Sequence, residues 1–194
     1  MKRLLENWRG FLTESKLRVF DFDDTLATTS ARIILTLSDG SKIEQTPAQF
    51  AVYEPKPGEL YGPEAFLQFR DVSDPREIKQ VTNILRNVVA AGNEDRKVAI
   101  LTARPHGAGT GIAKFLNDIG VEPESVEIVT LESSLPEDKR RWIQDQIDQG
   151  ATDVEFFDDS PKNVEAVKSL TNQYPGVRIR TRLIKYGERD EIPV

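Results

Sequence analysis

The chain lacks several residue types that define common kinds of site. It has no cysteine, which excludes disulfides, thiolate metal ligands and cysteine nucleophiles. Its single histidine, His106, excludes a histidine-rich metal site. No stretch approaches the roughly 18 apolar residues that a membrane-spanning helix needs. The start is signal-peptide-like only at Met1 to Leu5, because Glu6 interrupts the apolar stretch, and we therefore expect a soluble, cytoplasmic protein.

The chain also lacks an excess of positive charge. Its 32 acidic and 26 basic residues give a net charge of −6, which argues against strong non-specific binding to nucleic acid or to anionic membranes. The 194 residues, 38% of them hydrophobic, are enough for one domain over residues 1–194 with a small accessory insert.

Acidic residues are concentrated directly behind an apolar run. The segment Asp21-Phe22-Asp23-Asp24-Thr25 follows Leu17–Phe20, which has the pattern of a buried strand. Because side chains alternate along a strand, Asp21 and Asp23 are expected to share one face. Crowded carboxylates are costly to bury without a cation, and Mg²⁺ prefers hard oxygen ligands of this kind. The motif therefore indicates a metal-assisted site with two carboxylates in different roles.

Most of the remaining chain alternates between extended and helical patterns. Strands are expected at Leu17–Phe22, Lys97–Thr102, Ser125–Val129, Val154–Phe157 and Val177–Ile184. Helices are expected at Asp74–Gly92, Gly109–Ile119, Pro136–Gln149 and Pro161–Leu170. This order predicts an α/β fold whose mostly parallel sheet has helices on both faces.

Residues 28–72 interrupt this alternation and are expected to form a small insert, or cap, after the first strand. A hairpin is predicted over Ile33–Thr46, because Asp39-Gly40 suits a tight turn. Prolines and glycines then predict an irregular connection from Pro47, with a short helix over Pro63–Phe69. Residues 1–14 are expected to hold an N-terminal helix, either docked on the domain or binding a partner.

Three further segments end strands or begin helices at the edge where an open α/β sheet binds its ligands. Thr102 ends a strand, and its hydroxyl either donates to a phosphate-like oxygen or caps the next turn. Lys139 lies at the start of a helix, which is favourable if that end faces an anion. Asp158 and Asp159 end another apolar strand, and either meet the first acidic cluster around a cation or cap the following helix.

These motifs, in this order, resemble the haloacid dehalogenase (HAD) superfamily of phosphotransferases over most of the chain, from Leu17 to Leu170. The resemblance implies a three-layer, Rossmann-like fold with a small β-hairpin insert after strand one. The compact size and the insert also resemble small HAD proteins of tailed phages. Dehalogenases of the superfamily lack the second aspartate, so Asp23 favours phosphoryl chemistry.

The resemblance assigns the following roles. Asp21 would attack phosphorus and form an aspartyl-phosphate, and Asp23 would act as general acid and then general base. Thr102 and Lys139 would neutralise phosphoryl oxygens. Mg²⁺ would be held by Asp21, by the carbonyl of Asp23, and by Asp159, with Asp158 as the next candidate.

The function implied is a Mg²⁺-dependent phosphomonoester hydrolase, a phosphatase acting on a phosphorylated metabolite, nucleotide or polynucleotide end. The sequence Thr102-Ala103-Arg104, expected to bind substrate together with Lys139, resembles polynucleotide-end phosphatases, and a 3′- or 5′-end phosphatase is one alternative. Arg104 either grips a second phosphate or forms a surface ion pair. The alternating arginines of 178–182 form either a phosphate-facing patch or a solvated edge strand. A binding protein that kept the fold without catalysis is the remaining alternative.

Overall fold

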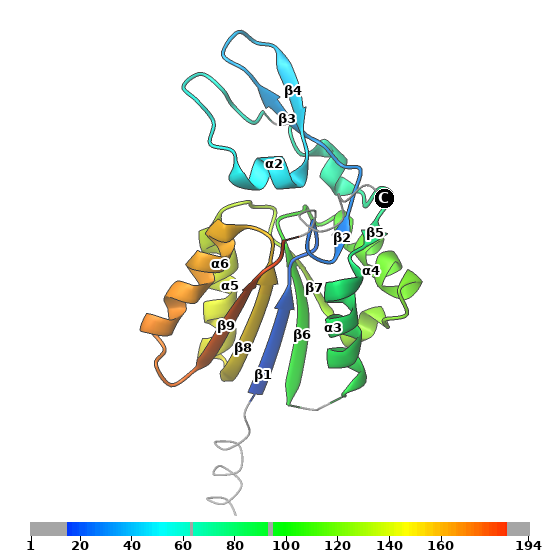
Figure 1. Ribbon diagram of the computed structural model, residues 1–194, viewed down its shortest axis with the longest axis vertical. Helices are drawn as coiled ribbons and strands as arrows, with labels where there is room; N and C mark the ends of the chain where they lie inside the picture. The colour runs from blue at the N-terminus through cyan, green and yellow to red at the C-terminus, as the bar shows by residue number, and fades with distance from the viewer. Residues whose placement is uncertain (1–14, 63, 93–94, 186–194) are drawn as a thin grey trace, which may run out of the picture.

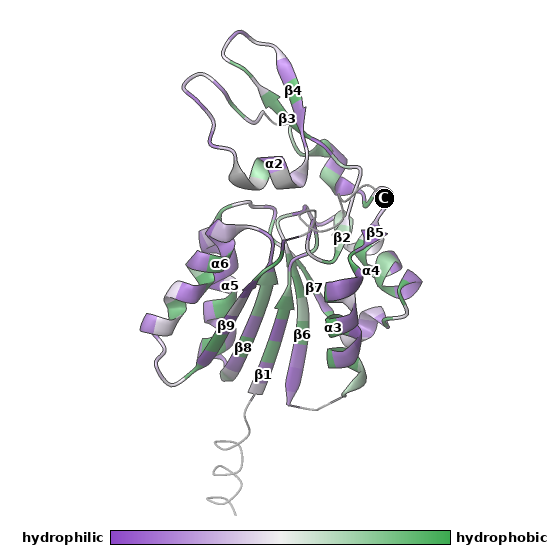
Figure 2. Ribbon diagram, in the orientation of Figure 1, coloured by the Kyte–Doolittle hydropathy of each residue, from purple (hydrophilic) through white to green (hydrophobic). Residues whose placement is uncertain are grey.

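A five-stranded parallel sheet forms the centre of the computed structural model, which describes residues 15–62, 64–92 and 95–185. The strand order is β7-β6-β1-β8-β9 (Figure 1). The strands are β1 (Ser15–Phe20), β6 (Arg96–Thr102), β7 (Glu127–Thr130), β8 (Ala151–Asp158) and β9 (Arg178–Leu183). β6 begins with Arg96 and Lys97 and continues into five buried residues, a change from hydrophilic to hydrophobic that Figure 2 shows along the strand.

Helices cover the sheet on both faces, as the alternation predicted. They are α3 (Lys79–Ala90), α4 (Ala108–Asp118), α5 (Pro136–Asp148) and α6 (Pro161–Lys168), with short 3₁₀ helices at Pro123–Ser125 and Ser169–Asn172. In Figure 1, α3 and α4 lie on one side of the sheet and α5 and α6 on the other. The predicted three-layer α/β fold is confirmed.

Each layer has its own hydrophobic core, because successive side chains of a strand point to opposite faces. Phe20 of β1 packs with α3 and α4, stacked on Phe157 at 4.6 Å between ring centroids. Leu17 and Val19 of the same strand pack with α5 and α6 instead. The buried apolar side chains therefore fix the register of β1, and with it the position at which Asp21 leaves the sheet.

The insert lies above the carboxyl ends of the strands (Figure 1). Its elements are β2 (Ala27–Thr28), β3 (Ile33–Thr36), β4 (Lys42–Gln45), α2 (Pro47–Val52), a 3₁₀ helix (Leu67–Arg70) and β5 (Arg76–Glu77). β3 and β4 form the predicted antiparallel hairpin, and β2 pairs with β5 where the chain leaves and returns. A small cluster of its own, including Ala31, Ile33 and Phe69 with Phe50 and Phe66 packed against it, holds the insert together.

Three details of the insert and its return differ from the prediction. The segment from Pro47 is a short helix rather than an irregular connection; Thr46 caps it in a reciprocal pair with Gln49, and Pro47 occupies the first turn. The helix predicted over Pro63–Phe69 is reduced, within the described residues, to the 3₁₀ turn at Leu67–Arg70. α3 begins at Lys79 rather than at Asp74, because Arg76–Glu77 pairs with β2.

Two further expectations concern the ends of the chain and the membrane. The predicted N-terminal helix within residues 1–14 lies outside the described residues. Within the described ranges, every helix is too short or too polar to cross a membrane.

Candidate functional site

The acidic turn after β1 forms the centre of the candidate site. Asp21 is 5% exposed, and its N–H donates to the carbonyl of Phe157 at 2.8 Å, so the turn continues from the sheet edge. Asp24 adopts a left-handed conformation with φ of 53°, which aspartate tolerates better than most residues. Thr25 is fully buried, and its hydroxyl has no hydrogen-bond partner in the described part of the chain. The turn thus gathers buried polar groups at one point.

Lys139 joins the two acidic segments. Its ammonium lies 2.6 Å from Asp21 Oδ1 and 2.8 Å from Asp158 Oδ2. The lysine is 3% exposed, and burial alone would lower its pKa, but Asp158 and Asp21 outweigh burial and raise it. Burial raises the pKa of Asp21 to about 7, with Lys139 opposing the rise. The lysine therefore remains charged and compensates two carboxylates, one directly after β1 and one at the end of β8.

Asp158 is fixed by the start of α6 as well as by the lysine. It is fully buried at the end of β8. Ser160 donates its backbone N–H to Asp158 Oδ1 at 2.8 Å, and the Asn163 amide donates to both carboxylate oxygens at 3.0 and 3.1 Å. α6 carries no side-chain cap of its own, so the capping alternative for Asp158 does not describe this helix. Both oxygens of Asp158 are therefore engaged within the protein, one of them by Lys139.

Asp159 is the carboxylate of this cluster that has no hydrogen bond or ion pair within the described residues. Burial, reinforced by Asp21, Asp158 and Asp24, raises the pKa of Asp159 to about 9, and Lys139 offsets the rise only in part. A partly buried carboxylate beside other carboxylates is unstable as an anion unless a cation lies near it. The donor set therefore fits a hard cation such as Mg²⁺ beside Asp21 and Asp159. Across the described ranges no group of three or more metal-binding side chains is arranged as a complete site.

Asp23 faces a different partner. Its two oxygens accept from Arg104 Nε and Nη2, both at 2.7 Å, and Oδ1 also accepts from the hydroxyl of Thr29 at 3.2 Å. Arg104 is 1% exposed, so it forms a buried ion pair rather than the surface pair that the sequence left open. Asp23 and Arg104 are therefore held together beside the nucleophile candidate, on the side of the insert.

Thr102 ends β6 at the same edge of the sheet. It is 1% exposed, and its hydroxyl oxygen accepts the N–H of Arg104 at 3.2 Å. This bond caps the turn through Ala103, as one of the two alternatives for Thr102 described. The hydroxyl hydrogen is not used in that bond, so donation to a ligand oxygen stays a prediction.

Other basic residues near Thr102 and Lys139 in the sequence lie away from the acidic cluster. Lys114, which occupies a helix soon after Thr102, is exposed and pairs with Asp118 on the surface at 2.5 Å. Arg140 bonds Gln173 and Arg141 pairs with Asp138, both in exposed positions. These contacts separate Lys139 from the other cations near it in sequence.

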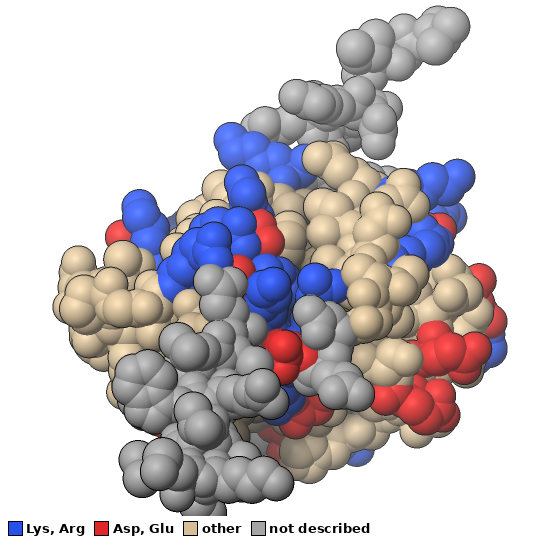
Figure 3. Space-filling model, turned by 90° about the horizontal axis from the view of Figure 1, so that it is seen from below, with Lys and Arg blue, Asp and Glu red and all other residues tan. Residues whose placement is uncertain are grey.

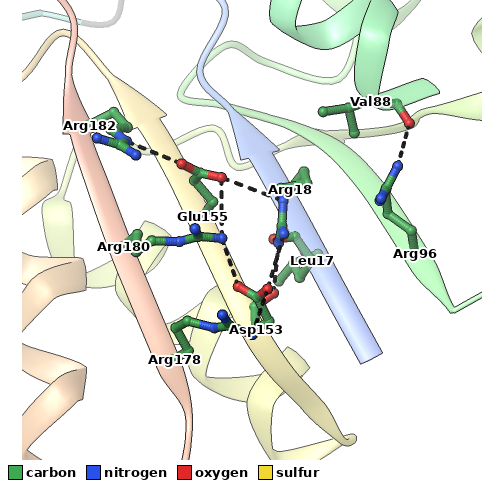
Figure 4. A network of polar contacts seen from close by, with 9 residues as sticks. All are labelled: Leu17, Arg18, Val88, Arg96, Asp153, Glu155, Arg178, Arg180 and Arg182. Carbon is green, nitrogen blue, oxygen red and sulfur yellow. Dashed lines mark hydrogen bonds and ion pairs between the residues drawn. The ribbon is translucent and has the colours of Figure 1, made fainter. Parts of the chain in front are cut away.

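The alternating arginines lie on β9, which is an edge strand of the sheet within the described residues. Figure 4 shows them beside Asp153 and Glu155 of β8 and Arg18 of β1. Figure 3 views the molecule from below and shows Lys and Arg side chains gathered on this lower face, with carboxylates between them. The arginines therefore make ion pairs with carboxylates along the sheet face. The sequence left two alternatives, a phosphate-facing patch and a solvated edge strand, and neither fully describes this arrangement.

Comparison with known proteins identifies the fold. No protein-family model and no curated protein sequence matches the chain. The HAD domain of effector protein Lem4 from Legionella pneumophila matches with a TM-score of 0.54 at 12% identity, over 91% of this chain and 89% of that chain. Legionella pneumophila effector Ceg4 matches with a TM-score of 0.51 at 14% identity, over 92% and 90%. The chain has a HAD-like fold.

The HAD-like fold confirms the fold that the resemblance implied. In this fold Asp21, Asp23, Thr102, Lys139 and Asp158–Asp159 come from separate segments, and the structure brings all of them to one edge of the sheet. Their chemical roles stay predictions, because a likeness at this identity concerns the fold.

One polar contributor was missed from the sequence. Thr29 bonds both Asp23 and Arg104, and it directly follows β2, where the chain enters the insert. No local signal marks it, since its partner Arg104 is 75 residues away along the chain. A pocket of about 260 Å³ lies beside it at the base of the insert, lined by Thr28, Thr29, Ser30, Arg32, Asp74 and Arg76.

Proposed function

We propose that this protein is a Mg²⁺-dependent phosphomonoester hydrolase that acts through an aspartyl-phosphate on Asp21. The HAD-like fold supports the reaction class. The observation that carries the proposal is the buried Lys139 ammonium between Asp21 and Asp158, beside Asp159, which has no hydrogen bond or ion pair to another described residue. More carboxylates meet here than one lysine neutralises, as expected of a site that binds a cation and phosphate.

In the first step, an oxygen of Asp21 attacks the phosphorus of the ester. The bond from phosphorus to the ester oxygen breaks, and Asp23 supplies the proton that this oxygen takes. Lys139 holds Asp21 Oδ1, which leaves Oδ2 for the attack. Lys139 and the hydroxyl hydrogen of Thr102 donate to the phosphoryl oxygens, where negative charge is carried through the transition state.

In the second step, water attacks the phosphorus of the aspartyl-phosphate. Asp23 accepts the proton of that water, the bond from phosphorus to Asp21 breaks, and inorganic phosphate leaves. Each proton that Asp23 donates is thereby recovered, and the site returns to its starting state. The same carboxylate serves as acid and base because the leaving oxygen and the attacking water occupy the same position opposite Asp21.

Mg²⁺ fits beside Asp21 and Asp159, with the main-chain oxygen of Asp23 as a further ligand. When bound, it would neutralise the phosphoryl oxygens and the carboxylates around them. Asp158 stays with Lys139 and Asn163, so its role is to orient the lysine. The insert lies over this edge of the sheet, and we propose that residues 28–72 act as a small cap that selects the phosphorylated substrate.

The test is the substitution Asp21→Asn, assayed with a generic aryl phosphate in the presence of Mg²⁺. We expect turnover to be lost while the thermal melting curve shows a folded protein. After an acid quench, wild-type protein should retain label from a phosphorus-labelled substrate, and the variant should not. Asp118→Asn, the same change at an exposed ion-paired aspartate, is the matched control and should behave as wild type.

Two outcomes would contradict the proposal. Turnover by Asp21→Asn at the wild-type rate would remove Asp21 as nucleophile. A wild-type protein that hydrolyses no phosphomonoester, including a 3′-phosphorylated oligonucleotide, would favour a binding protein with a HAD-like fold.

A further inference from the structure

Every hydrogen-bond donor of Arg104 is used inside the protein. A guanidinium has five N–H donors in a fixed plane. Nε and one hydrogen of Nη2 bond the two oxygens of Asp23, and Nη2 also bonds the hydroxyl of Thr29 at 3.0 Å. Nη1 bonds the carbonyl oxygens of Phe69 at 3.2 Å and Asp71 at 2.8 Å. In this arrangement no donor remains for a phosphate of the substrate.

These acceptors come from three separate parts of the chain. Asp23 belongs to the acidic turn, Thr29 directly follows β2 where the chain enters the insert, and the two carbonyls belong to the segment that returns from the insert. The guanidinium also lies over the ring of Phe69, 4.7 Å from its centroid. A buried charge is costly unless it is fully paired and hydrogen-bonded, so the loss of one acceptor weakens the hold on the others.

We propose that Arg104 is a positioning residue that orients the carboxylate of Asp23 for proton transfer and couples it to both connections of the insert. The proposal rests on the proposed function, in which Asp23 protonates the leaving oxygen. A bidentate guanidinium fixes both oxygens of a carboxylate in one plane, which a single ammonium does not do. The same guanidinium also donates to the carbonyl oxygens of Phe69 and Asp71, so the orientation of Asp23 depends on the position of the insert relative to the sheet.

The first experiment compares two esters in Arg104→Lys. 4-Nitrophenyl phosphate releases a stable anion and needs little protonation, whereas benzyl phosphate releases an alkoxide that needs a proton. Leaving-group release is measured in the first turnover, before hydrolysis of the phosphoenzyme. We expect the benzyl rate to fall by roughly a hundredfold, the low end of general-acid contributions, and the nitrophenyl rate to change little. KM for both esters should stay unchanged.

Two further variants make the result specific. In an Asp23→Asn background, Arg104→Lys should cause no additional loss, because Arg104 acts through Asp23. Arg18→Lys changes another buried arginine, which pairs with Asp153 and Glu155 of β8 rather than with Asp23, and should leave both rates as in wild type. Arg104→Lys is preferred to a neutral substitution because it retains the positive charge that pairs with the largely buried Asp23.

The possible outcomes distinguish a failure of the role proposed for Arg104 from a failure of the proposed function. Equal losses for both esters, or a rise in KM for both, would overturn the positioning role and indicate a structural or phosphate-binding arginine. A wild-type protein that releases neither leaving group overturns the proposed function, and the role of Arg104 with it. Coupling to the insert predicts faster amide hydrogen exchange at residues 27–30 and 69–72 in Arg104→Lys, with exchange in the β3–β4 hairpin unchanged. Unchanged exchange at residues 27–30 and 69–72 would contradict the coupling.

Discussion

Magnesium binding should be strongly pH-dependent in this protein, because two of the carboxylates that would hold the ion have raised pKa values. Burial raises the pKa of Asp21 to about 7 and that of Asp159 to about 9. Mg²⁺ binds the ionised forms, so protons compete with it. With those two pKa values, lowering the pH from about 8 to about 6 should weaken binding by roughly a thousandfold, one decade for each unit of pH per proton displaced.

The pH dependence of Mg²⁺ binding can be measured as a change in melting temperature. At a Mg²⁺ concentration about 100 times the dissociation constant at pH 8, the ion stabilises the folded state by about 2.7 kcal/mol. For a chain of this size that corresponds to a rise in Tm of roughly 5 to 11 °C. At pH 6 the same concentration falls below the weakened dissociation constant, and the rise in Tm should be close to zero.

Without metal, the stability of the folded protein should fall as the pH rises, opposite to the pH dependence of Mg²⁺ binding. A carboxyl whose pKa is higher in the folded state than in the unfolded chain holds a proton that the unfolded chain has released. The free energy of unfolding therefore falls as the pH rises from about 4 to about 9, the window between the unfolded and folded pKa values of Asp159. Asp159→Asn should flatten this slope and raise the stability of the metal-free protein at pH 8.

The assay is thermal melting with and without Mg²⁺ at pH 6 and pH 8, for the wild type, Asp159→Asn and the surface control Asp118→Asn. Only the wild type and the surface control should show the rise in Tm at pH 8. A rise of equal size at both pH values would refute the protonation argument. A rise that persists in Asp159→Asn would refute the place of that carboxylate beside the ion.

Two further substitutions test buried ion pairs by chemical denaturation. Lys139→Met leaves two buried carboxylates without their cation and should cost about 3 to 5 kcal/mol at neutral pH; an unchanged denaturation midpoint would contradict this. Asp153→Asn, whose side chain is 4% exposed, should cost roughly 3 kcal/mol because Arg18 loses its buried partner. Glu155→Gln, at 15% exposure, is the matched control and should cost less; equal losses would refute the dependence on burial.

Local pattern was sufficient for much of the architecture. The apolar runs of β6 and β8 and the helical spacing of α4 and α5 predicted elements whose bounds agree to within a few residues. The helix α2 was not predicted, although the sequence contains a signal for it: Thr46 and Gln49 form a capping box at its start. The start of α3 was predictable only with knowledge of the partner strand, since Arg76–Glu77 pairs with β2 rather than extending the helix.

The sequence by itself determined the chemical inventory: an acidic turn behind a buried strand, a second acidic strand end, and an α/β order that brings strand ends to one edge. Only the tertiary structure decided the pairings within that inventory. Lys139 meets Asp21 across 118 residues of chain, and Arg104 meets Asp23 across 81. Composition and spacing do not encode such contacts, because the distance between two side chains after folding depends on how the whole sheet and the insert pack together. Among the described residues, the same packing gives Asp159 no hydrogen bond or ion pair, and it buries the guanidinium of Arg104.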